Sequence, residues 1–120
     1  MTSVISLRLP SALERTVRAN AAESEMSVAK VVQWVLERAL ISQYSFAALP
    51  DPRRLLDAKL DLRLPPALVG RIRAESRLLS VSVSVYTRVI LFAYYTKRLV
   101  VVQIGGRYTL AENHEQEKSA

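Results

Sequence analysis

The sequence contains no cysteine, only one histidine and only three glycines among its 120 residues. Without cysteine the chain can form no disulfide framework, no thiolate zinc site and no cysteine nucleophile. The one histidine, His114, lies in a polar segment, so we expect a solvated side chain rather than a ligand or a catalytic base. No nucleophile, base and orienting group can be assembled from these residues, so an enzyme is the least favoured class and no metal or cofactor is expected.

Long apolar runs are also absent, because no stretch approaches the roughly 18 residues that a membrane span requires. The first ten residues, MTSVISLRLP, lack the basic stretch and long apolar run of a secretory signal. We therefore expect a soluble, cytoplasmic protein without membrane contact. Half of the residues are apolar, so a chain of this length can bury one modest core and forms one domain.

Positive charge predominates, with a formal net charge of +6 and a pI near 10.1. Such a charge predicts an anionic partner, and nucleic acid is the commonest partner of a small basic domain. Residues 50–100 contain ten lysines and arginines against four acidic residues, whereas residues 1–49 contain five against four. The second half of the chain therefore carries most of the positive field.

An internal repeat divides the chain. The segment ISLRLPSAL at residues 5–13 returns as LDLRLPPAL at residues 60–68, an offset of 55 residues. The same offset aligns further identical pairs without a gap, among them Arg18/Arg73, Ser27/Ser82, Val28/Val83 and Leu36/Leu91. Agreement of this extent indicates two copies of one structural unit.

Each copy begins with the period-2 alternation of a short, half-buried strand. The apolar set is Ile5, Leu7 and Leu9 in the first copy and Leu60, Leu62 and Leu64 in the second. Pro10 and Pro65 end these strands, because proline cannot donate to a ladder. One unit alone would leave its strand unpaired, so we expect the two strands to pair antiparallel over a shared four-helix core.

Two helices are predicted after each strand. Ser11 and Glu14 have the spacing of a capping box, which predicts Ser11 as the N-cap of the first helix, and Pro66 suits the first helical turn of the second copy. The serine of the repeated SV pair is the predicted N-cap of each second helix. Residues 80–85, SVSVSV, alternate like a strand, but the register of the repeat favours a helix after Ser82.

The predicted boundaries divide a single domain into five segments. They are residues 3–42 for the first unit, 43–57 for a connection, 58–97 for the second unit, 98–110 for a C-terminal hairpin and 111–120 for a polar tail, disordered or a frayed helix. The connection is expected to contain at most one helical turn, and Trp34 to pack in the core or against the connection. The hairpin either covers one end of the core or contacts DNA or another protein.

The doubled order of strand, proline, helix and SV-initiated helix resembles the ribbon-helix-helix family, the fold of the Arc and MetJ repressors. The resemblance covers residues 3–42 and 58–97. It implies a mainly α fold with a two-stranded antiparallel ribbon, built as a tandem pseudo-dimer in one chain and monomeric in solution. Single-chain members such as TraY and the VirC-region accessory protein of T-DNA transfer are similar in this respect.

By position, the resemblance implies two kinds of DNA contact. Outward strand residues would read bases in the major groove, and they are Val4, Ser6, Arg8, Lys59, Asp61 and Arg63. Backbone N–H groups at helix N-termini would hold phosphates, at Ser27, Val28, Ser82 and Val83. A basic helix face would be either a phosphate contact or a solvated surface, and it comprises Arg71, Arg73 and Arg77.

These inferences favour a protein that binds double-stranded DNA. Its role would be that of a transcriptional regulator or of an accessory factor in conjugative or T-DNA-type transfer, together with other proteins of such a complex. The alternative is an antitoxin-like or other protein-interaction module on the same fold. Residues 98–120, partly a hairpin, are short for the partner-binding tail of an antitoxin. This shortness favours the DNA-binding hypothesis.

Overall fold

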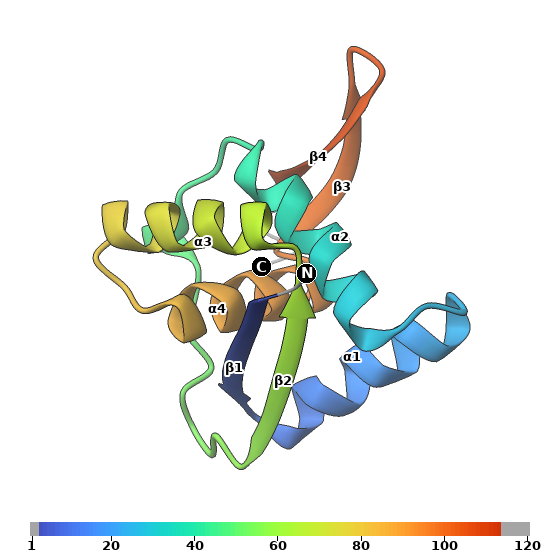
Figure 1. The fold of residues 1–120 in the computed structure, drawn as a ribbon. Coiled ribbons are helices and arrows are strands. Elements are labelled where there is room, and N and C mark those ends of the chain that lie inside the picture. Colours follow the sequence, from blue (N-terminus) through green and yellow to red (C-terminus); the bar gives the residue numbers. More distant parts are fainter. Residues whose placement is uncertain (1–2, 114–120) are drawn as a thin grey trace, which may run out of the picture.

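The computed structural model describes residues 3–113 and contains two strand-helix-helix repeats followed by a hairpin (Figure 1). The first repeat consists of β1 (Ser3–Leu9), α1 (Ser11–Glu23) and α2 (Val28–Leu40). The second consists of β2 (Ala58–Leu64), α3 (Pro66–Leu78) and α4 (Val83–Tyr95). The connection contains the short 3₁₀ helix η1 (Phe46–Ala48), and the hairpin consists of β3 (Leu99–Ile104) and β4 (Arg107–Glu112). The predicted tandem ribbon-helix-helix topology and C-terminal hairpin are confirmed.

β1 and β2 pair antiparallel along their whole length, as predicted. Ser3 lies opposite Leu64 at one end of this ribbon, and Ser6 lies opposite Asp61 at its centre. Ser6 and Asp61 are also separated by the repeat offset, so they occupy equivalent positions in the two copies. This central pair therefore lies on the pseudo-twofold axis that relates the repeats.

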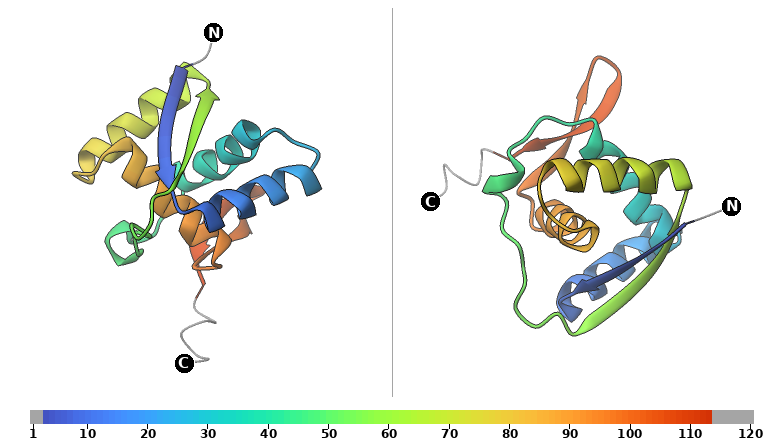
Figure 2. Two further views of the ribbon diagram at one scale, coloured as in Figure 1. Left: turned by 90° about the horizontal axis from the view of Figure 1, so that it is seen from below. Right: turned by 60° about the vertical axis from the view of Figure 1, so that its left-hand side comes forward.

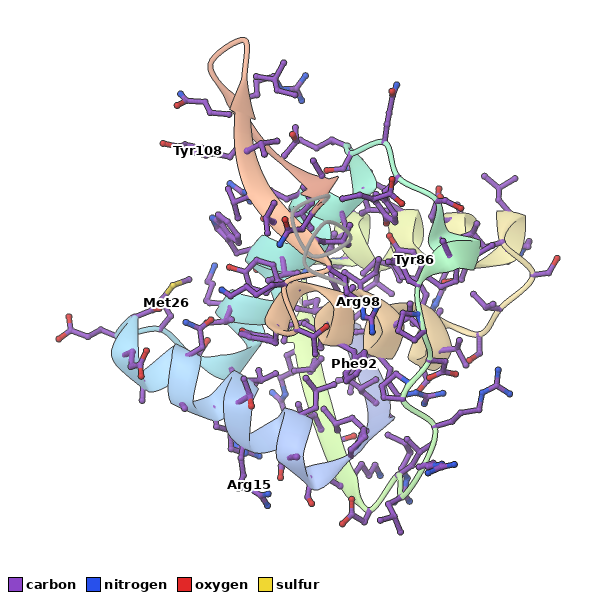
Figure 3. All side chains as sticks on the ribbon, turned by 180° about the vertical axis from the view of Figure 1, so that it is seen from behind. Arg15, Met26, Tyr86, Phe92, Arg98 and Tyr108 are labelled. Carbon is purple, nitrogen blue, oxygen red and sulfur yellow. The ribbon has the colours of Figure 1, made fainter. Side chains whose placement is uncertain are left out.

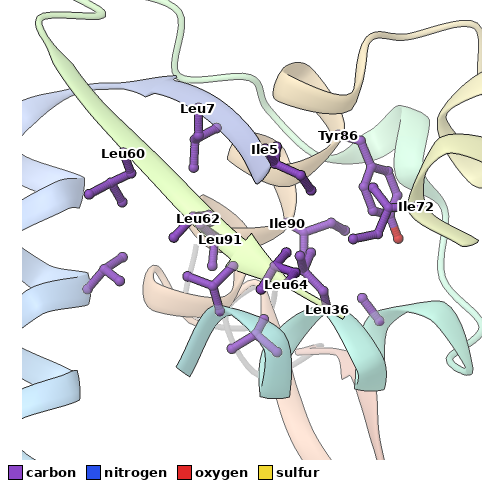
Figure 4. Packing of buried hydrophobic residues seen from close by; sticks show 14 of the residues in the cluster. Ile5, Leu7, Leu36, Leu60, Leu62, Leu64, Ile72, Tyr86, Ile90 and Leu91 are labelled. Carbon is purple, nitrogen blue, oxygen red and sulfur yellow. The ribbon is translucent and has the colours of Figure 1, made fainter. Parts of the chain in front are cut away.

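A single core lies between the ribbon and the four helices (Figure 4). The inward residues of both strands are buried, as predicted, and they are Ile5, Leu7, Leu9, Leu60, Leu62 and Leu64. Burial of each such side chain contributes roughly 1.5–3 kcal/mol, so a core shared by both copies is much larger than one unit could form. Trp34 packs at its margin against Tyr94, with ring centroids 6.3 Å apart. Among residues 3–113, no single helix is long and apolar enough to cross a membrane. Only α3 and α4 taken together are long and apolar enough, and the chain bends by 95° between them.

α1 does not begin with the predicted capping box. Pro10 is the N-cap, and Ser11 lies inside the first turn with its backbone N–H donated to Asp57 Oδ1 at 2.9 Å. The side chain that accepts a hydrogen bond from the N-terminus of α1 is thus Asp57 of the connection and not Ser11. The second copy needs no such acceptor at α3, because Pro66 occupies the equivalent position and has no N–H.

The second helix of each repeat begins as predicted. Ser27 Oγ accepts a hydrogen bond from the backbone N–H of Lys30, and Ser82 Oγ accepts one from that of Val85, both at 3.1 Å. α4 therefore starts inside the segment that alternates like a strand. The helix is favoured there because it buries Tyr86 completely within the common core.

The hairpin projects from the body on the side away from the ribbon (Figure 2). Leu99 and Leu110 at its base are buried, whereas Ile104 and Tyr108 are 67% and 53% exposed. The turn consists of two glycines with φ of 58° and 78°, a region that favours glycine. β4 continues to Glu112, two residues beyond the predicted hairpin end, and His114 and the rest of the predicted tail lie outside the described residues.

Because both ribbon strands come from one chain, we expect the protein to be a monomer at low micromolar concentration. Light scattering should give a mass near 13.5 kDa. An obligate dimer at this concentration would count against intramolecular pairing of the strands.

The contact between Asp57 and Ser11 makes stability depend on pH. The hydrogen bond donated by the Ser11 N–H holds the pKa of the Asp57 carboxyl below its usual value. The carboxylate therefore stabilises the fold fully above its unfolded-state pKa of about 3.9, and this contribution is lost as the pH falls through the lowered folded-state pKa. We expect Asp57→Ala to lower the thermal midpoint at pH 7 and to converge with the wild type at low pH.

Thermal melts from pH 7 downward measure this effect, with Glu23→Ala as a control at an exposed acidic residue near the other end of α1. Parallel pH profiles of wild type and Asp57→Ala would show that Asp57 does not act as an ionised cap.

Candidate nucleic-acid interface

The six predicted base-reading residues lie together on the outer, solvent-exposed face of the ribbon. The structure pairs them across the strands as Val4 with Arg63, Ser6 with Asp61 and Arg8 with Lys59. They share one face because each strand alternates buried and exposed residues and the register preserves that alternation. We refer to these six side chains as the outer ribbon face.

The centre of the outer ribbon face is acidic and partly engaged. Ser6 Oγ donates to Asp61 Oδ1 at 2.8 Å, and Lys59 Nζ lies 3.9 Å from the same oxygen. The side chain of Asp61 is 59% exposed, so this ion pair is weak and screened by solvent. Both contacts involve Oδ1, and no hydrogen bond or ion pair among residues 3–113 involves Oδ2, so the second carboxylate oxygen is available to a ligand.

The two ends of the outer ribbon face differ in charge. Arg8 lies opposite Lys59 at one end, whereas Arg63 lies opposite the apolar Val4 at the other. Lys59 and Val4 are equivalent positions of the two copies, so this difference departs from the pseudo-twofold symmetry. A ligand that follows the ribbon meets two cations, then one anion, then a single cation.

The N-termini of two helices flank the ribbon, because α4 packs against β1 and α2 packs against β2 (Figure 1). The backbone N–H of Arg8 donates to Ser84 Oγ in the first turn of α4, at 3.4 Å. The first N–H groups of a helix have no partner within the helix, and each cap serine satisfies only one of them. Within residues 3–113, the N–H groups of Val28 and Val83 have no hydrogen-bond partner, so they are available to an anion at the positive end of each helix dipole.

Arg88 of α4 is a buried cation that sequence analysis missed. Its side chain is 6% exposed, and Nε and Nη2 donate to Oδ1 and Oδ2 of Asp51 at 2.7 and 3.0 Å. Nη1 donates to the backbone carbonyl of Arg8 at 3.1 Å. We refer to this guanidinium and its three hydrogen bonds as the Arg88 fork. It joins the connection, α4 and β1, and it positions the backbone of Arg8 without itself reaching the outer ribbon face.

A sequence signal for Arg88 does exist. It is the one charged residue of α4, a helix that buries most of its residues, and a charged residue there requires a buried partner. That partner, Asp51, is 37 residues away, and no spacing rule connects the two.

The three arginines of α3 do not lie in one place. Arg71 lines a groove with Arg38 of α2 and Arg107 of the hairpin, on the side of α3 that faces the hairpin. Arg73 and Arg77 are exposed on the same helix. Arg71 thus faces the hairpin side of α3, and a phosphate contact by Arg71, Arg73 or Arg77 stays a prediction.

Comparison with known proteins finds no matching family model, curated protein or solved structure. Within residues 3–113, no three acidic, histidine or cysteine side chains are grouped as metal ligands. The functional inference therefore rests on the geometry and charge of the ribbon and on the repeated motif.

Removal of one partner from the Arg88–Asp51 pair should destabilise the fold by about 3–5 kcal/mol, because a buried charge is left unpaired. We expect this loss for Arg88→Met and for Asp51→Asn in urea denaturation. The double variant Arg88→Met/Asp51→Leu should recover much of it, since no buried charge remains.

The exposed pair Arg18–Glu14 provides the control, and Glu14→Gln should cost no more than about 0.5 kcal/mol. A similarly small loss for Arg88→Met would show that the fork is not an important structural link.

Proposed function

We propose that this protein binds double-stranded DNA by inserting the outer ribbon face into the major groove. The observation that carries the proposal is an exposed two-stranded ribbon, with Arg8, Lys59 and Arg63 on its outer face, between two helix N-termini. The major groove of B-DNA, about 12 Å wide, admits a two-stranded β-ribbon. The net charge of +6 favours attraction to the phosphate backbone.

The side chains of the outer ribbon face suit base edges. Arg8 and Arg63 can each donate two hydrogen bonds to O6 and N7 of guanine. The free oxygen of Asp61 can accept from cytosine N4, and Val4 can pack against a thymine methyl group. The face therefore combines donors, an acceptor and an apolar contact, which is the chemistry of direct readout.

The helix N-termini suit phosphates on either side of the ribbon. N–H groups at Val28 and Val83 would bind the two DNA backbones, and such contacts fix register without reading sequence. The Arg88 fork ties β1 to α4, so the base-reading Arg8 and a phosphate-binding helix terminus form one rigid element. This coupling would hold Arg8 at a constant depth in the groove.

The biological role that we propose is transcriptional regulation or assistance in conjugative or T-DNA-type DNA transfer, in line with the family that the repeated motif resembles. A protein-interaction module is the second candidate. The hairpin favours it, because Ile104 and Tyr108 are exposed apolar residues on an element directed away from the ribbon. The two roles are compatible if the hairpin contacts another protein of a regulatory or transfer complex while the ribbon holds DNA.

We expect the affinity for duplex DNA to fall steeply as the salt concentration rises. The logarithm of the binding constant should fall linearly with the logarithm of the salt concentration, with a slope of about 0.9 for each phosphate neutralised. Fluorescence anisotropy titrations at several salt concentrations measure this slope. Weak binding that does not change with salt would reject the DNA-binding proposal and favour the protein-interaction module.

We also expect a preferred DNA site without palindromic symmetry, because Lys59 and Val4 differ at equivalent positions. Arg8→Ala and Arg63→Ala should each relax base preference in its own half of the site, by roughly 1–3 kcal/mol of discrimination. Selection from random duplex DNA measures this, with the exposed hairpin variant Arg107→Ala as the control. If both ribbon variants select the wild-type site, the ribbon does not read bases.

A further inference from the structure

The connection between the repeats passes round one end of the ribbon and is fastened there twice. Asp51 is held by Arg88, which also donates to the carbonyl of Arg8. Asp57 accepts a hydrogen bond from the N–H of Ser11, just beyond the end of β1. Residues 51–57 therefore begin and end beside residues 8–11, at the end of the ribbon where Arg8 lies opposite Lys59 (Figure 1).

Between these fastenings the connection exposes two consecutive arginines. The side chain of Arg53 is 79% exposed, and its Nε lies 3.5 Å from Asp51 Oδ2, a contact too exposed to hold the guanidinium firmly. Arg54 is also exposed, and within residues 3–113 it makes no ion pair. Both side chains are therefore available to an anionic ligand.

The charge at this end of the ribbon is not balanced. Arg53 and Arg54 join Arg8 and Lys59, and Arg15 of α1 is close enough to help lower the pKa of the Asp57 carboxyl. Asp51 is paired with the buried Arg88, Asp57 keeps its charge while it accepts from the Ser11 N–H, and Asp61 lies 3.9 Å from Lys59, so cations remain in excess. Figure 3 shows Arg15 at this end of the molecule and Tyr108 of the hairpin at the other.

Within residues 3–113, no connection with consecutive arginines lies at the opposite end of the ribbon, where β1 begins and β2 ends. There the outer ribbon face presents only Arg63, opposite Val4. The connection occurs once in the chain, so its two arginines can lie at only one end of the ribbon. The charge of these two arginines is thus a property of the fused chain, and it adds to the difference between Lys59 and Val4 within the repeats.

We propose that Arg53 and Arg54 form an arm that binds DNA phosphates beyond the ribbon, on its Arg8–Lys59 side only. The inference rests on the proposed DNA binding and adds a second contact to it. Guanidinium groups bind phosphate through paired N–H donors, and an arm outside the groove meets the backbone rather than base edges. The arm would make the protected DNA segment longer on one side and give the bound protein a fixed orientation.

The test compares Arg53→Ala/Arg54→Ala with the charge-matched control Arg98→Ala/Arg107→Ala, whose arginines are exposed and belong to the hairpin end of the molecule. For the arm variant we expect the salt slope to fall by about 1.8, from two phosphate contacts of about 0.9 each. The hydroxyl-radical footprint should shorten on one side only, while the selected bases stay unchanged. The control should keep the wild-type footprint.

Arg54→Ala alone, which leaves the Arg53–Asp51 contact in place, should give about half of the change in slope. An equal loss of slope in the arm variant and the control would overturn the arm, because it would reflect net charge alone. An unchanged slope and footprint in the arm variant, with base preference still dependent on Arg8 and Arg63, would overturn the arm and leave the proposed function intact. Failure of the wild type to bind duplex DNA would overturn both, and thermal melts of every variant verify that it is folded.

Discussion

The pairing of β1 with β2 is the interaction on which the rest of this structure depends. A single strand would leave its N–H and C=O groups without partners, and a single repeat would have too little apolar surface to enclose a core. Pairing places the apolar sides of both strands over four helices and turns the six side chains of the outer ribbon face outward. It also brings Ser6 within 2.8 Å of Asp61, so scaffold and candidate interface arise from the same set of backbone hydrogen bonds.

Fusion of two copies in one chain allows equivalent positions to differ. In a homodimer, a change at one position appears twice, whereas here Val4 corresponds to Lys59 and Gln33 corresponds to the buried Arg88. Arg88 needs one acidic partner, and the connection supplies one, Asp51. The desolvation of such a pair largely offsets its attraction, so its main contribution is to hold the connection, α4 and β1 in one arrangement. The asymmetry of charge along the ribbon follows from differences of this kind.

The two ends of the molecule have different surfaces, which suits them to different ligands. The ribbon end presents exposed cations and two helix N-termini, whereas the hairpin end presents exposed apolar side chains and an open strand edge. Polyanions bind the first kind of surface, and proteins bind the second. The hairpin lies after the second copy and outside the repeat, so it adds a surface without disturbing the ribbon.

Local periodicity and the repeat together determined most of the fold from the sequence. Alternation in β1 and β2 identified the buried leucines, the prolines ended both strands, and the offset of 55 placed the helix after Ser82 despite its strand-like alternation. The same alternation identified the members of the outer ribbon face, because the side chains of a strand point to opposite faces in turn. These features depend on neighbours close in the chain, or on identity between the copies, and so can be read without a structure.

Only the tertiary structure decided how the non-repeated parts meet the repeats. Ser11 has the spacing of a capping residue, yet its N–H is satisfied by Asp57, 46 residues away. Arg71 looked equivalent to Arg73 and Arg77 on a basic helix, yet it lies in a groove with Arg38 and Arg107 of other elements. These contacts depend on the path of a connection and a hairpin that occur once. No periodicity or repeat constrains such a path, so it follows only from the packing of the whole chain.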